Sequence, residues 1–218
     1  MAERVFGSEL LRLVEVMDRL RSPGGCAWDA EQTHQSLIKY LLEESYEFID
    51  AIETDDRAGM REELGDVLLQ VYFHSRIAQD HPTDPFTIDD VAGAIADKLI
   101  GRHPHVFAGL EVSGTDEIIE NWEAIKAKEK GRTSAIDGVA MSQPALPLVA
   151  KLIYRADKYG SAISIPEYSS DQPATEESVG AALASVIAWA YKHEIDPELA
   201  LRAQARAIIR EITSGEQL

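Results

Sequence analysis

The sequence predicts an all-α protein, a bundle of amphipathic helices whose sites are lined by helix faces. Apolar residues recur at helical spacing through most of the 218 residues. Residues that commonly cap helices precede these segments, and segments rich in proline, glycine or serine follow them. There is no convincing pattern of alternating strand residues, and the one β-like fragment is the short AISI at 162–165.

The first predicted helix is capped by Ser8 and ends at SPGG, residues 22–25. Its apolar stripe consists of Leu10, Leu13, Val14, Met17 and Leu20. Asp29 and Gln32 have the spacing of a capping box, so we expect them to open a helical region that runs toward Glu53.

The later helices are predicted from the same signals. The proline-containing segment 81–85 ends a helix near Asp80, and Thr87 caps the next helix, which runs toward Arg102. The segment 103–115 is expected to be a loop. The remaining expected elements are a helix capped by Thr115, a helix near 147–159, a serine- and proline-rich loop at 161–175, and two final helices separated at 195–197.

Composition restricts the function classes. The formal net charge of −17 argues against binding to a nucleic-acid backbone, which needs Lys and Arg to neutralise phosphates. It does not exclude a polyphosphate ligand, because a bound metal and a few local bases invert the local field. Cys26 is the only cysteine, so no internal disulfide forms, and we expect a small buried side chain there rather than a nucleophile.

The sequence also predicts the compartment. No N-terminal segment resembles a signal peptide. The apolar run LASVIAWAY at 183–191 is well short of the ~20 residues that span a bilayer. We therefore expect a cytoplasmic protein without a membrane partner.

The most informative residues are four carboxylates placed symmetrically about one short turn. Glu44 and Glu47 are three residues apart on one predicted helix, and Glu63 and Asp66 are three residues apart on the next. If the chain reverses at 54–57, the helices run antiparallel, so that 47 lies level with 63 and 44 lies level with 66. Three residues of helix rise ~4.5 Å, so all four side chains converge on one volume. Their mutual repulsion is relieved by a hard divalent cation with oxygen ligands.

The alternative is a solvated acidic face, which fits any one of these side chains. Glu44 and Glu47, however, border the apolar stripe of their helix, which consists of Ile38, Leu41, Leu42, Ser45, Phe48, Ile49 and Ile52. Glu63 and Asp66 border the stripe of Leu64, Val67, Leu68 and Val71. Glu43 points further from the seam. Geometry alone leaves both interpretations open.

A faint internal repeat is present. Residues 63–76 align without gaps to residues 178–191, and the glycines at 65 and 180 coincide. The acids do not coincide, because Ser178 and Ala181 stand at the positions of Glu63 and Asp66. Either two amphipathic helices resemble each other by composition, or a second copy has kept its packing and lost its metal ligands.

The acid pattern EExxE followed by ExxD resembles the signature of MazG-type nucleoside triphosphate pyrophosphohydrolases. Ala27 stands where this family usually has a proline. The likeness covers about residues 5–160, and 161–218 resembles a truncated second MazG repeat. The segments similar to family motifs are GGCAWDAEQTHQSL at 24–37, EESYE at 43–47, ELGD at 63–66, DKLIGRHPHVF at 97–107 and NWEAIKAKEK at 121–130.

This resemblance implies a MazG-like helical bundle that forms a homodimer or a higher homo-oligomer. It implies hydrolysis of a nucleoside triphosphate to the monophosphate and pyrophosphate, with Mg²⁺ as the metal and Mn²⁺ as a substitute. Glu44, Glu47, Glu63 and Asp66 would be the metal ligands, and Glu43 a further catalytic candidate. One carboxylate would activate the attacking water, and the sequence leaves open which one.

The resemblance also implies substrate contacts. Lys98 and Arg102 are four residues apart on one predicted helix face, so both could reach a triphosphate. Trp122 and Lys126 have the same spacing; Trp122 would stack on a base or fill the core. For the histidines in 103–105 we favour a role in loop structure over metal binding.

The expected function is removal of unwanted nucleotides from the pool. One alternative is a pyrophosphohydrolase acting on another nucleotide, such as phosphoribosyl-ATP. A second alternative is a non-catalytic helical adaptor that binds metal or nucleotide. We expect residues 1–135 to be the catalytic domain and 136–218 to be a structural segment related to a degenerate second repeat.

Overall fold

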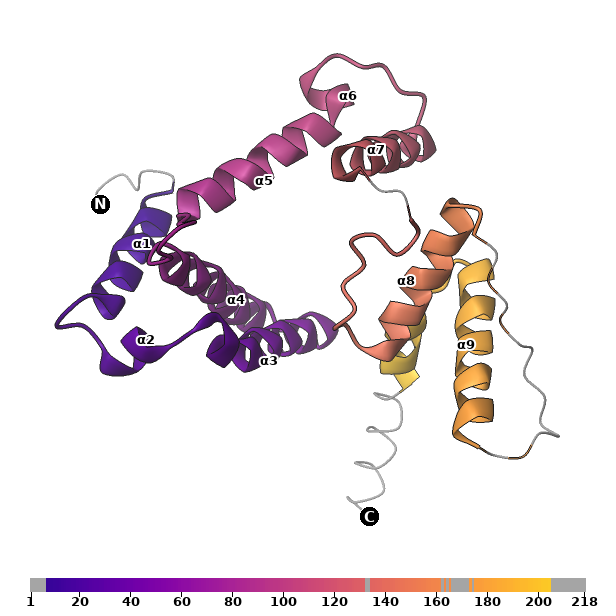
Figure 1. Cartoon of the computed structure of the whole chain (residues 1–218), viewed down its shortest axis with the longest axis horizontal. Coiled ribbons are helices and arrows are strands. Elements are labelled where there is room, and N and C mark those ends of the chain that lie inside the picture. The colour runs from indigo at the N-terminus through magenta and orange to yellow at the C-terminus, as the bar shows by residue number, and fades with distance from the viewer. Residues whose placement is uncertain are drawn as a thin grey trace. The chain divides into compact units, whose positions relative to one another are not determined.

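The computed structural model describes residues 7–131, 134–161, 163, 165, 173 and 175–204. All regular elements in this part of the chain are helices, which confirms the all-α prediction (Figure 1). None of them is long and apolar enough to cross a membrane. The helices are α1 (Ser8–Arg21), α2 (Ala27–Glu31), α3 (His34–Glu53), α4 (Arg57–Ala78), α5 (Ile88–Arg102), α6 (Pro104–Phe107), α7 (Thr115–Lys130), α8 (Ala145–Lys158) and α9 (Glu176–Lys192).

The chain folds as two compact units, residues 1–118 and 119–218. The first contains α1 to α6. The second contains most of α7, then α8, α9 and a helical stretch at 197–204. The predicted functional boundary at residue 135 stays a prediction.

A helical hairpin of α3 and α4 is the most extensively packed pair in the first unit. Thr33 caps α3, because its hydroxyl accepts from the Ser36 N–H at 3.2 Å and the Ser36 hydroxyl lies 3.0 Å from the Thr33 N–H. Asp56 caps α4, accepting from the N–H groups of Ala58 and Gly59 at 3.0 Å. The predicted reversal at 54–57 is confirmed.

The turn between these helices is a Schellman motif. Asp55 has a left-handed φ of 55°, and the Asp56 N–H donates to the Ala51 carbonyl at 2.9 Å. The Asp55 N–H donates to the Ile52 carbonyl at 3.1 Å. A Cβ on Gly59 would lie 2.8 Å from the Asp56 carboxylate, so glycine there leaves room for the cap of α4.

The core of the first unit fixes the far end of the hairpin. Met17 of α1, Leu37 of α3, and Tyr72 and Phe73 of α4 are buried together. Trp28 of α2 closes this cluster, with ring edges facing Tyr40 and Phe73 at centroid distances of 5.9 and 6.4 Å. Trp28 covers the edge of the core and remains 49% exposed. This packing fixes α3 against α4 and thereby the register of the acids they bear.

Two helix starts differ from the prediction. Ser8 is the first residue of α1 and not its cap; Gly7, with a φ of 86°, holds the cap position without a side-chain bond. Asp29 and Gln32 form no capping box, because Asp29 lies inside the short α2. Thr33 offers its hydroxyl directly to the first turn of α3, and this interaction defines the start of the long helix.

Smaller differences concern the loops. The expected loop 103–115 contains the one-turn helix α6, which begins at Pro104, a residue suited to the first helical position. Two residues of the β-like fragment 162–165 lie outside the described residues.

In the second unit, α8 and α9 pack against each other. The Tyr191 hydroxyl of α9 lies 2.7 Å from the Asp157 carboxylate of α8 and donates to it. Arg155 is buried and donates to the carbonyls of Ser134 and Asp137 at 3.4 and 3.2 Å. These bonds anchor the segment before α8 to the helix pair.

Candidate metal centre

Three carboxylates of the hairpin meet at one point between α3 and α4. Glu44, Glu63 and Asp66 each present an oxygen, and these oxygens all lie within 4.8 Å of one another. All three side chains are half-buried. The two helices place them there because both run straight from a turn that holds the chain antiparallel.

The fourth predicted acid, Glu47, is more exposed but joins the same group. It is a hydrogen-bond partner of Glu63, an interaction between two carboxyls that requires a shared proton. The carboxylate with the largest effect on Glu44 is Asp66. The pairs expected from distance to the turn, 47 with 63 and 44 with 66, are therefore the pairs in the structure.

The acids of this group repel one another and are partly removed from water. Desolvation, followed by the charge of Asp66 and then of Glu47, raises the pKa of Glu44. Desolvation, followed by the charges of Glu47 and Asp66, raises the pKa of Glu63. Glu43 is exposed and adds to the repulsion on Glu44. A group of carboxylates that resists full ionisation favours any cation able to contact several of them at once.

The donor set fits a hard divalent cation. Every candidate ligand is a carboxylate oxygen, which is the ligand type that Mg²⁺ and Mn²⁺ take in proteins. Three oxygens within 4.8 Å need only small movements to contact a common ion. The site residues are on helices that are fixed by packing, so this geometry is largely preformed.

The predicted phosphate-binding residues lie on α5. Lys98 is exposed and Arg102 is buried. α5 begins beside the end of α4, far from the turn of the hairpin, and the two helices diverge (Figure 1). Neither base is among the groups that shift the pKa of Glu44 or Glu63. Within one chain, the structure does not bring Lys98 and Arg102 to the acids.

Trp122 and Lys126 form a local pair on α7. The Lys126 ammonium lies 4.2 Å from the centre of the Trp122 ring and 3.8 Å from the Glu123 carboxylate. Both side chains are half-buried. This part of α7 belongs to the second unit, whereas the acids belong to the first.

The histidines of 103–105 lie at the junction of α5 and α6. His103 ends α5, and its Nδ1 lies 2.7 Å from the Leu99 carbonyl. Its ring lies 5.6 Å from that of His105. They are absent from the acid group.

Sequence reasoning missed a polar line that continues from the acids along the hairpin. Gln70, one helical turn beyond Asp66, is 5% exposed, and its carbonyl oxygen has no hydrogen-bond partner among the described residues. One turn further, His74 stacks on His34 of α3 with Nδ1 atoms 2.7 Å apart. The spacing 66, 70, 74 on one helix face was the signal that could have identified it.

Comparison with known proteins gives a consistent answer. Residues 32–107 match the MazG nucleotide pyrophosphohydrolase domain. The chain is 39% identical to the nucleoside triphosphate pyrophosphohydrolase/pyrophosphatase MazG of Thermotoga maritima, over 94% of this chain and 85% of that protein. It is 49% identical to an uncharacterised 26.1 kDa protein of Streptomyces cacaoi, over 96% of this chain and 84% of that one.

A third relative is longer. The nucleoside triphosphate pyrophosphohydrolase of Mycobacterium tuberculosis is 48% identical over 80% of this chain, which spans only 52% of that protein. The acid group on α3 and α4 lies wholly inside the matched segment 32–107. The chain thus belongs to the MazG nucleotide pyrophosphohydrolase family, as its motifs predicted.

Proposed function

We propose that the protein is a Mg²⁺-dependent nucleoside triphosphate pyrophosphohydrolase that converts NTPs or dNTPs and water into monophosphates and pyrophosphate. The observation that supports this most is the convergence of Glu44, Glu63 and Asp66, with Glu47 bonded to Glu63, on a hairpin inside the family segment. The names of the mycobacterial and Thermotoga relatives support the reaction class. The role would be cytoplasmic clearance of unwanted nucleotides.

When bound, Mg²⁺ would neutralise charge on the triphosphate and lower the pKa of bound water. Glu44, Glu47, Glu63 and Asp66 would hold it. The raised pKa values of Glu44 and Glu63 mean that metal binding would displace protons held by these two groups. One of these acids, or Glu43 beside them, would accept the proton of the attacking water. The water oxygen would bond to the α-phosphorus, and the bond from that phosphorus to the α,β-bridging oxygen would break, so that pyrophosphate leaves.

Lys98 and Arg102 are proposed to contact the phosphates, and Trp122 and Lys126 to contact the rest of the nucleotide. Because α5 diverges from α4, we propose that the two bases of one subunit serve the acids of the other in a homodimer. Apolar side chains that α3 and α4 leave exposed would supply the dimer contact: Ile38 (54%), Leu42 (54%), Leu64 (51%) and Val71 (39%).

A substrate panel tests this function. Each NTP and dNTP is incubated with and without Mg²⁺, and pyrophosphate and orthophosphate are measured separately. We expect pyrophosphate and a monophosphate, only with Mg²⁺ or Mn²⁺. Release of orthophosphate, or turnover at full rate in excess chelator, would reject the proposal.

A further inference from the structure

One face of α9 is apolar, exposed and without charge. The segment 178–191 contains no charged residue, in a chain with 27% charged residues. Along it, Val179, Leu183, Val186 and Trp189 are each more than half exposed, at 53, 55, 53 and 60%. We call these four residues the α9 stripe. Their spacing of four and three residues keeps them along one side of the helix, as in a helix–helix seam.

Packing within the second unit uses mainly other residues, although Trp189 also borders a cavity next to Ile153 and Asp157 of α8. α9 contacts α8 and buries Ile187 and Ala190, while Tyr191 bonds to Asp157 of α8. The four stripe residues remain exposed after these contacts are made. Isolated exposed leucines are ordinary, but four large apolar side chains in a row on a helical segment without charged residues indicate an interaction surface.

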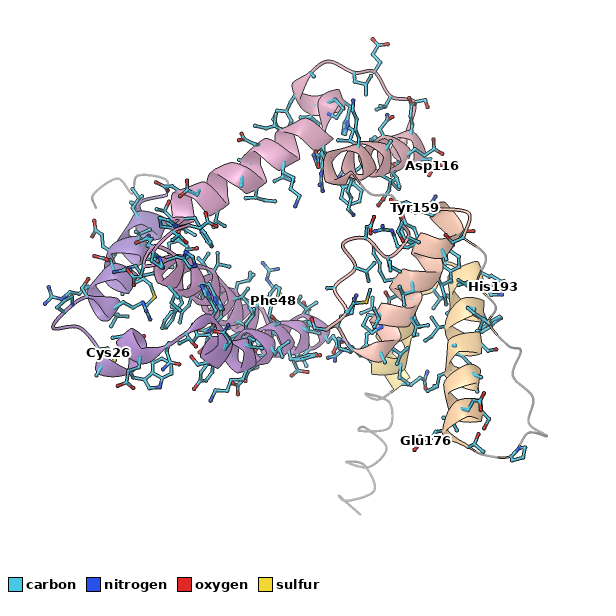
Figure 2. The ribbon with its side chains drawn as sticks, viewed as in Figure 1. Cys26, Phe48, Asp116, Tyr159, Glu176 and His193 are labelled. Atoms are coloured by element: carbon cyan, nitrogen blue, oxygen red, sulfur yellow. The ribbon has the colours of Figure 1, made fainter. Side chains whose placement is uncertain are left out.

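The two ends of α9 carry opposite charge. Glu176 and Glu177 lie in the first turn, and Lys192 lies in the last turn. Glu176 and His193 mark these ends in Figure 2. A parallel pair of such helices would place like charges together. An antiparallel pair would place the acids of each copy level with the Lys192 of the other, and would oppose the helix dipoles favourably.

The sequence of α9 is self-complementary in this antiparallel arrangement. When Leu183 lies opposite Val186 of a second copy, Glu177 falls level with Lys192 of that copy. In the same register, Trp189 falls between Ser178 and Ala182 of the second copy, whose small side chains leave room for an indole ring. A single register thus pairs the apolar residues at the centre, leaves room for the Trp189 ring and places opposite charges together at the ends.

We propose that α9 is a self-association surface, which pairs antiparallel with α9 of a second copy of this chain through the α9 stripe. Its residues are different from those of the acid site and from those on the apolar side of the α3–α4 hairpin. It gives the C-terminal unit a function that needs no metal ligands: it links subunits. A two-fold pair of this kind is closed on its own; together with the proposed α3–α4 dimer it would join dimers into a tetramer if the two axes intersect, and into a chain of dimers if they do not.

Disulfide trapping tests the partner and its direction. Cys26 is first replaced by serine in the full-length chain, which leaves no native thiol. In that background, the double variant Leu183→Cys/Val186→Cys should form a covalent dimer under mild oxidation. The single variant Val179→Cys should not, because antiparallel pairing separates the two copies of position 179 by eleven residues of rise, or ~16 Å. Covalent dimers of Val179→Cys would mean parallel pairing, and their absence from the double variant would mean no α9 pairing; either result overturns the proposal.

A charge placed in the stripe provides the matched control. In the Leu183→Cys/Val186→Cys background, Val179→Glu should weaken self-association and lower the trapped fraction by about tenfold or more, since a carboxylate would be buried at the seam. Met141→Glu, at a side chain that is 56% exposed in the same unit but off α9, should leave trapping unchanged. Equal effects of the two substitutions would contradict the assignment of the stripe. Pyrophosphate release per chain should survive Val179→Glu, so a failure here is distinct from a failure of the proposed function.

Discussion

α4 and α9 align without gaps over fourteen residues, and they bury corresponding positions but carry different polar groups. The aligned residues Tyr72 and Ile187 are both buried, as are Ser75 and Ala190. At the outer face, Leu64 and Val179 are both about half exposed, at 51 and 53%. The correspondence in burial supports the repeat that the sequence suggested. The two helices thus share the positions of their apolar residues but not the carboxylates of Glu63 and Asp66.

The difference lies in what stands opposite each helix. α4 faces α3, which supplies Glu44 and Glu47 to meet Glu63 and Asp66. α9 has Ser178 and Ala181 at the aligned positions and packs on α8, which has no acidic residue before Asp157. A metal centre of this type needs two acid-bearing helices at one level. One helix with the right packing pattern is insufficient.

The largest effect is expected from substitution of the two acids that α4 contributes to the metal centre. Glu63→Gln or Asp66→Asn removes one charged oxygen donor with little change in volume, so the helices should stay folded. Pyrophosphate release should fall by at least ~10²-fold, the range for loss of a catalytic acid–base or metal-binding group. Far-UV circular dichroism should be unchanged. Full activity in both variants would show that these acids are not the centre.

The reciprocal experiment is on α9. Ser178→Glu with Ala181→Asp copies the α4 acids onto the second helix. We expect no added metal site, because no second pair stands opposite, and titration calorimetry should give the wild-type stoichiometry. Additional stoichiometric Mg²⁺ or Mn²⁺ binding would mean that one helix suffices.

Mixing of two inactive variants tests whether the bases of α5 serve the acids of the other subunit. Glu63→Gln and the double variant Lys98→Ala/Arg102→Ala should each be nearly inactive. If acids and bases of one site come from different subunits of a two-fold dimer, mixed dimers hold one intact site, and a re-equilibrated equal mixture should recover about a quarter of wild-type activity. No recovery, with subunit exchange shown by mass spectrometry, would place all these residues of a site in one chain.

Metal should change the stability of the hairpin in a pH-dependent way. The folded pKa values of Glu44 and Glu63 are raised, so the folded state without metal binds more protons than the unfolded chain above the ordinary value of 4.5. Stability without metal therefore rises as pH falls through the raised values, and repulsion is fully present above them. Mg²⁺ relieves the same repulsion, and at a hundred times its Kd would stabilise by about 2.7 kcal/mol.

The measurement is the difference in melting temperature with and without Mg²⁺. It should be larger at pH 8 than at pH 5, because protons compete with the metal. Burial, and then the charge of His34, lowers the pKa of His74. His74 affects the pH dependence of stability equally with and without metal, so its contribution cancels in the difference in melting temperature. In Glu44→Gln the metal-free protein should be more stable than wild type and the Mg²⁺ effect smaller. An Mg²⁺ effect independent of pH would contradict carboxylate ligation.

The order of the helices and the pairing of the acids could be predicted from sequence because both follow from local spacing. Period and caps locate α3 and α4, and equal distance from one turn pairs 44 with 66. The position of α5 relative to the acids could not be predicted, because it depends on the loop 81–85 and on tertiary contacts. The start of α3 was misassigned because Asp29 and Thr33 are both suitable caps in the sequence, and the start of α1 because Gly7 rather than Ser8 holds the cap position.

The smallest expected effects are those of substitutions at the C-terminal ends of α3 and α9. Each of these helices is followed by a non-glycine residue in the left-handed region. Asp55 after α3 has a φ of 55°, and Glu194 after α9 has a φ of 56°. Both complete the same motif, since the Ile195 N–H donates to the Ala190 carbonyl at 3.0 Å just as Asp56 donates to Ala51. Glycine removes the Cβ clash of this conformation, worth about 1–2 kcal/mol, but increases the entropy of the unfolded chain.

Asp55→Gly and Glu194→Gly should therefore each stabilise the protein by about 0.5–1 kcal/mol. The gain should be smaller for Asp55, because aspartate enters the left-handed region more readily than glutamate. Urea unfolding, with hydrogen exchange to assign the change to α3 or α9, measures both. Alanine at the same positions is the control and should give no gain, because it retains the Cβ. A larger gain at Asp55 than at Glu194 would mean that the Asp55 carboxylate adds to the repulsion in the hairpin, and that the two turns differ in charge rather than in backbone strain.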